Sequence, residues 1–197
     1  MDPEAAVAKI IEDPDRAKHL GIHGVLTTAF DDGYPTEIIR PLLRHSDKRV
    51  AAMALDALWE TVEQPYFPEL TRFFSWDRDW AVVAAAQIIS HAPQHQSVVI
   101  LKLLEHPSAV VRSEIMELLT RLDRAEFSGF LESNIARASV PADHVEGLTV
   151  VASGKMATDA EILALIESPS AVSRRYGWIA AKRLEHERPE LLAKAED

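Results

Sequence analysis

Leu103-Leu104-Glu105-His106-Pro107-Ser108 is the stretch that decides the fold, because versions of it recur about every 31 residues along the chain. Each version has a bulky apolar pair, then a short polar turn with a helix-start residue, then a helical apolar pattern. A period of this size is typical of arrays of helix pairs, in which each pair buries its apolar face against its neighbours. The other versions are Leu42-Leu43-Arg44-His45-Ser46-Asp47, Phe73-Phe74-Ser75-Trp76-Asp77-Arg78 and Leu165-Ile166-Glu167-Ser168-Pro169-Ser170.

Apolar residues between these turns follow a helical spacing, with hardly any strand-like alternation. Val111, Ile115 and Leu119, for example, share one helix face. We therefore predict an all-α fold, a right-handed α-α superhelix (solenoid) of about six helix pairs that forms a single domain over residues 1–197. The predicted pairs are 4–29, 35–62, 67–91, 94–122, 124–153 and 158–187, followed by a C-terminal cap at 189–197.

Helix-start signals support these boundaries. Asp13-Pro14 and Ser168-Pro169 each place a capping side chain before a proline, and Asp123–Glu126 and Thr158–Glu161 have the spacing of capping boxes. The copy expected between 124 and 153 is degenerate and carries Gly147 inside its helix. A glycine there costs about 1 kcal/mol relative to alanine, so it marks either a close helix crossing or a local irregularity in the stack, and we favour the crossing.

Composition narrows the possible classes of protein. The chain has no cysteine, which excludes disulfides and thiolate metal sites and suits a cytoplasmic protein. Its acidic first residues lack the apolar segment of a secretory signal. No run approaches the 18 or so apolar residues of a membrane span, so we expect no membrane partner.

The net charge of −10 is spread along the chain, and no third of it is basic. This distribution argues against a nucleic-acid partner, because a protein that binds a phosphate backbone needs a cationic face. A diffuse negative field favours a basic protein partner, or serves solubility alone.

The segment His106–Arg112, followed by Ile115 and Leu119, resembles the second helix of a HEAT-like repeat. The resemblance covers about 150 residues, with departures: Ala51 and Val82 stand where the arginine would be. The period is similar to that of bacterial HEAT-like repeats of the phycobilin-lyase type, although no lyase motif is present. The resemblance implies an α-solenoid and says little about activity.

Candidate catalytic and metal residues form no complete set. His19 and His23 are four residues apart on a predicted helix, but two ligands make an incomplete metal site. His45 and His106 occupy equivalent repeat positions, so we expect them to pack in or cap the turns. Gly154-Lys155 lacks the rest of a phosphate loop, and no nucleophile elbow exists. We predict no catalytic site, no metal and no cofactor, hence no enzyme.

Tryptophans and acidic residues are the candidate binding residues. Trp76 and Trp80 flank Asp77 and Asp79 at a predicted helix start, where an indole either closes the core or anchors a partner. Helical phase also places polar residues opposite the apolar stripes, where second helices would line a concave groove. These groove residues, graded from acidic to basic along the chain, are Asp56, Trp59, Glu60, Gln87, His91, Glu117, Arg121, Arg175, Trp178 and Lys182.

The function predicted from these features is that of a non-catalytic scaffold that holds a basic protein partner in its concave groove or at its turn edge. An immunity or inhibitor protein and an adaptor both fit. The alternatives are a phycobilin-lyase-like or other small-molecule-binding protein and, less favoured by the charge, a DNA-alkylation-type HEAT-like protein. The oligomeric state is left open.

Overall fold

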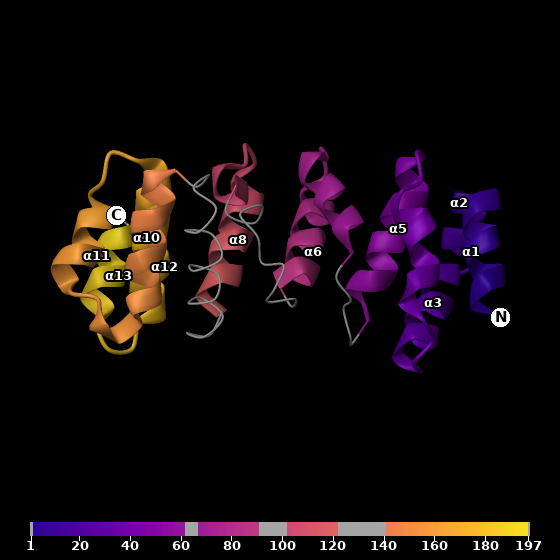
Figure 1. The fold of residues 1–197 in the computed structure, drawn as a ribbon, viewed down its shortest axis with the longest axis horizontal. Helices are drawn as coiled ribbons and strands as arrows, with labels where there is room; N and C mark the ends of the chain where they lie inside the picture. The colour runs from indigo at the N-terminus through magenta and orange to yellow at the C-terminus, as the bar shows by residue number, and fades with distance from the viewer. Residues whose placement is uncertain (1, 62–66, 91–101, 122–140, 197) are drawn as a thin grey trace. The chain divides into compact units, whose positions relative to one another are not determined.

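A computed structural model describes residues 2–61, 67–90, 102–121 and 141–196. Every regular element in these ranges is an α-helix or a 3-10 helix, which confirms the all-α class. None of the helices in the described ranges is long and apolar enough to cross a membrane. The chain divides into two compact units, Met1–His95 (unit 1) and Gln96–Asp197 (unit 2), shown in Figure 1.

Unit 1 places its longer second helices next to one another. The helix α5 packs against α3 on one side and α6 on the other, while α1 packs on α3 and η2 packs on α6. Val50, Ala54 and Leu58, which follow the helical spacing, are fully buried on α5. The elements are α1 (Pro3–Glu12), α2 (Pro14–His19), α3 (Ile22–Asp31), η1 (Thr36–Ile39), α4 (Arg40–Leu43), α5 (Lys48–Trp59), η2 (Pro68–Ser75) and α6 (Asp79–Ser90).

The predicted pair 4–29 is three helices instead of two. Asp13 ends α1 and also caps α2, because its Oδ1 accepts a hydrogen bond from the Arg16 amide at 3.1 Å. Gly21 then adopts a φ of +64°, in the left-handed region that a helix cannot continue through. His19 and His23 therefore lie on different helices, which makes the expected pairing along one helix wrong.

Unit 2 is built around α12, which packs against α8, α10, α11 and α13. A strictly serial stack of the predicted pairs would place α10 between α8 and α12, whereas here α12 itself packs along α8. The guanidinium of Arg183 on α12 supports this contact by donating to the Leu119 carbonyl at 3.3 Å. The elements are η4 (Leu103–Glu105), α8 (Ala109–Arg121), α10 (Ala142–Ser153), η5 (Gly154–Met156), α11 (Asp159–Ile166), α12 (Ala171–Arg183) and α13 (Pro189–Glu196).

The recurrent turn has the same hydrogen bond in three copies. The Nδ1 of His45 accepts from the Asp47 amide at 3.1 Å, and the Nδ1 of His106 accepts from the Ser108 amide at 3.2 Å. At the equivalent position, the Ser168 hydroxyl accepts from the amide two residues later at 3.2 Å. The predicted turn role of the two histidines is confirmed.

The arginine of the HEAT-like pattern closes the same turn. The Nη1 of Arg112 donates to the carbonyls of His106 and Pro107 at 2.7 and 2.8 Å. Arg174 makes the same two bonds to its own turn, each at 2.9 Å. The close sequence match between 107–112 and 169–174 thus has a physical cause, since one cation satisfies two carbonyls that precede the helix.

Besides Asp13, which caps α2 as predicted, two other predicted helix starts can be compared directly with the structure. The capping box of Thr158 and Glu161 is present at the start of α11. The helix α12 begins two residues later than predicted, with Ser170 rather than Ser168 as its N-cap. The predicted box Asp123–Glu126 lies outside the described residues.

Gly147 lies at a close crossing of α10 and α12, as predicted. A Cβ at this position would lie 2.2 Å from Cδ2 of Tyr176, a fully buried side chain of α12. The absence of a side chain is therefore what lets the Tyr176 ring pack onto α10.

Candidate functional site

Unit 1 contains a pocket of about 430 Å³ between α2, α3, α5 and the start of α6. Pockets of about 300–1,000 Å³ are the usual size for small ligands and are also large enough for a side chain of a partner protein. The lining residues are Pro14, Asp15, Lys18, His23, Arg49, Ala52, Met53, Asp56, Trp59, Arg78 and Trp80.

Two tryptophans give this pocket an aromatic lining. Trp59, the last residue of α5, is 40% exposed, and Trp80, in the first turn of α6, is 38% exposed. The indole Nε1 of Trp59 donates to Oε1 of Gln87 at 2.7 Å, which fixes the ring orientation across two helices. The structure thus brings together Asp56, Trp59 and Gln87 of the predicted groove, and places Trp80 of the predicted turn edge beside them.

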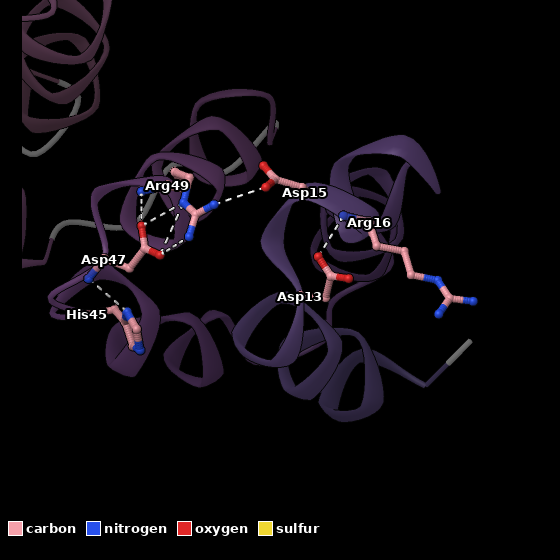
Figure 2. A network of polar contacts seen from close by, with 6 residues as sticks. All are labelled: Asp13, Asp15, Arg16, His45, Asp47 and Arg49. Carbon is pink, nitrogen blue, oxygen red and sulfur yellow. Dashed lines mark hydrogen bonds and ion pairs between the residues drawn. The ribbon is translucent and has the colours of Figure 1, made fainter.

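Arg49 connects the pocket wall on α5 to α2. Its Nη1 donates to Oδ2 of Asp15 at 3.0 Å and its Nη2 donates to Oδ2 of Asp47 at 2.7 Å. Figure 2 shows the guanidinium lying between these two carboxylates. Hydrogen bonds from the Arg49 side chain lower the pKa of Asp47 to about 2, and the same bonds raise the pKa of Arg49. The positive charge of Arg49 is therefore already balanced within the protein.

Three potential metal ligands meet at the edge of the pocket. His23 comes from the first turn of α3, and Asp56 and Glu60 lie one turn apart at the end of α5. One ligand atom from each lies within 4.8 Å of the other two. The sequence named His23 as a candidate metal ligand but paired it with His19. It could not reveal these carboxylates as partners, because only the packing of α3 on α5 brings His23 close to them.

Trp76 is buried, which favours the core-closing role over the predicted role as a partner anchor. Its side chain is only 7% exposed, its ring lies 4.6 Å from the Phe73 ring, and Nζ of Lys48 lies 5.5 Å from its centroid. The indole closes the core at the end of η2, which is the first of the two roles that the sequence allowed. Asp77 is exposed and pairs with Lys48 at 3.3 Å, and Asp79 is half-buried at the start of α6.

Two predicted groove residues of unit 2 lie in a separate pocket of about 360 Å³. Trp178 is half-buried there, close to Met116 and Ile166. Arg175 lines the same pocket, but its Nη1 donates to the Leu104 carbonyl. This hydrogen bond occupies one nitrogen of the guanidinium that was expected to contact a partner.

The remaining predicted groove residues are divided among several environments. Lys182 pairs with Glu185 at 2.7 Å, Glu117 is half-buried on α8, and Arg121 is exposed at the end of that helix. His91 lies outside the described residues. The acidic-to-basic gradient spans both units and stays a prediction.

Sequence reasoning missed a set of polar contacts around a buried histidine in unit 2. His144 is buried on α10, where its Nδ1 lies 3.0 Å from the Tyr176 hydroxyl and its Nε2 lies 2.9 Å from Oε1 of Glu105. Burial, together with the negative charge of Glu105, raises the pKa of Tyr176 well above its ordinary value. These contacts satisfy polar groups between α10, α12 and η4, so we assign the three side chains a structural role.

Comparison with known protein families and with curated protein sequences found no match to this chain. The likeness to HEAT-like repeats therefore remains a resemblance. Any functional assignment has to come from the chemistry of the sites described above.

Proposed function

We propose that this chain is a HEAT-like α-solenoid of about six helix pairs that binds a protein partner without catalysis, and that the unit 1 pocket is its contact site. One observation carries the proposal. Trp59 and Trp80 come from two successive predicted helix pairs, 35–62 and 67–91, yet both expose their rings to the same pocket.

Exposed tryptophans that line a concave site suit a protein interface. An indole supplies a large contact area with only two rotatable bonds, and tryptophan is enriched among residues that dominate binding energy. The hydrogen bond from Trp59 to Gln87 holds one ring in place before binding, which reduces the entropy lost on association.

The charges around the pocket support a partner with a basic anchor residue. Asp56 and Glu60 lie next to Trp59, so an arginine or lysine of the partner can contact both an indole face and a carboxylate. The net charge of −10 also attracts a basic partner at long range. Lys18 and Arg78 line the same pocket, so the complementary surface also needs an acidic or polar group. An immunity or inhibitor protein and an adaptor both fit this description.

A small-molecule ligand is the second candidate, because the pocket volume lies in the range of ligand sites. In that case Trp59 and Trp80 would enclose the ligand itself. This is the small-molecule-binding alternative that the sequence analysis left open. The two candidates differ in what remains bound to the purified chain.

Affinity capture from the native host, with the bound material identified by mass spectrometry, tests the proposal. We expect a stoichiometric protein partner, and we expect Trp59→Ala and Trp80→Ala each to raise its Kd at least fivefold, the effect of losing about 1 kcal/mol at an anchor residue.

The control for this experiment is Met156→Ala in η5 of unit 2, since Met156 is 66% exposed and does not line the pocket. The control should bind as the wild type does. Unchanged binding by both tryptophan variants would remove the pocket from the proposal, and recovery of a small molecule without a protein would favour the second candidate.

A further inference from the structure

His23, Asp56 and Glu60 form a set of potential metal ligands; the proposed function uses the two carboxylates as contacts for a basic residue and gives His23 no role. The imidazole and the two carboxylates come from two different helices, and one ligand atom from each lies within 4.8 Å of the other two. His23 and Asp56 also line the tryptophan pocket. The set therefore lies where a bound ion could be reached from the pocket.

The charge of the two carboxylates favours a cation at this site. Asp56 and Glu60 are four residues apart, a spacing at which like charges on a helix repel each other. In the described part of the chain, no ion pair includes either of them. Arg49 lines the same pocket, but its guanidinium is bonded to Asp15 and Asp47. Lys18 and Arg78 also line this pocket but form no ion pair with either carboxylate in the described ranges, so a bound cation can balance these charges locally.

We propose that His23, Asp56 and Glu60 bind a divalent transition-metal ion of the Zn²⁺ type. One neutral imidazole and two carboxylates provide nitrogen and oxygen donors and neutralise the two positive charges of the ion. Three protein ligands leave at least one coordination position open.

Binding requires the cluster to close by about 1 Å. Zinc ligands lie about 2.0–2.2 Å from the ion in a tetrahedral arrangement, so two donors on one ion are about 3.3–3.6 Å apart. The three ligand atoms here lie within 4.8 Å of one another. Glu60 is exposed at the end of α5, so rotation of its side chain can close the difference.

Calorimetric titration of the metal-free full-length chain with zinc chloride tests the site without any partner, so its outcome is independent of the proposed function. We expect one ion per chain. We also expect His23→Ala, Asp56→Asn and Glu60→Gln each to raise the Kd for Zn²⁺ at least tenfold, because each removes one ligand.

The matched control is His19→Ala, which removes an exposed histidine at the end of α2, four residues before His23. Its Kd should stay within twofold of the wild type. The same concentration of Zn²⁺ should also raise the Tm of the wild type more than that of Glu60→Gln, which gives a second readout in a variant expected to fold.

Three results would overturn the proposal. They are the absence of a wild-type binding isotherm, equal affinity in the wild type and Glu60→Gln, and a loss of binding in His19→Ala that matches the loss in His23→Ala. The last result would assign any bound zinc to the two histidines instead of the cluster.

Discussion

Arg49 shows how one side chain can fix a wall of the candidate pocket. The Asp47 carboxylate accepts hydrogen bonds from the guanidinium of Arg49 and from the backbone amide of Arg49, the latter at 2.8 Å. The second contact, to Asp15, joins α2 to α5 (Figure 2). Because the Asp47 bonds favour the ionised carboxylate, they should stabilise the fold only while Asp47 is charged.

Asp47→Asn is expected to be less stable than the wild type at neutral pH, by an amount that shrinks in acid. The pKa of Asp47 is about 2 in the folded chain, and an aspartate in an unfolded chain has a pKa of about 3.9. A lowered folded pKa contributes stability that is present above the unfolded value and disappears as the pH falls from about 4 to about 2. Urea unfolding of both proteins between pH 7 and pH 2 measures the difference, and a difference that does not change with pH would contradict the assignment.

At single residues, the sequence predicted contacts along a helix better than contacts between helices. Helical phase placed Asp56 and Trp59 on one face of α5, with Gln87 as a groove neighbour, and the Trp59–Gln87 hydrogen bond agrees with that placement. Helical phase could not show whether the Trp76 ring is buried or exposed, because its burial against Phe73 depends on the path of η2. The meeting of His23 with Asp56 likewise depends on how α3 packs on α5.

At the scale of elements, the crossing of α10 and α12 depends on one missing side chain. We expect Gly147→Ala to lower the free energy of unfolding by about 1–3 kcal/mol, the usual cost of overpacking, because its Cβ would overlap the Tyr176 ring. Chemical denaturation followed by circular dichroism provides the measurement.

Gly24→Ala is the matched substitution for this prediction. Gly24 lies within α3, and a Cβ there would have nothing within 4 Å. This variant should gain about 0.4–1 kcal/mol, since alanine has less freedom to lose on folding. Equal effects of the two substitutions would show that helix propensity, and not the crossing, determines the response at Gly147.

Elements were predicted best where a local signal specifies them. The Thr158–Glu161 capping box and the His45 and His106 turns depend on neighbouring residues, and the structure contains all three. The break at Gly21 was missed because a glycine within a helical pattern does not reveal its φ angle. The start of α12 was placed too early because the first turn residue was taken for the N-cap.

For the whole molecule, the repeat period predicted the all-α class correctly, and the described ranges are helical throughout their regular elements. The same period could not reveal that α12 packs along α8, because that contact joins helices far apart in the sequence and includes the hydrogen bond from Arg183 to Leu119. The pocket was predicted only in part. Asp56, Trp59 and Trp80 were among the candidates, whereas Lys18, Arg49 and Met53 come together through packing between helices.

Hydrogen–deuterium exchange of the full chain, with and without the captured partner, tests the central claim most directly. The account predicts that the partner slows exchange at the end of α5 and the start of α6, which carry Trp59 and Trp80, and at the start of α3. Protection confined to unit 2, with these three segments unchanged, would contradict it.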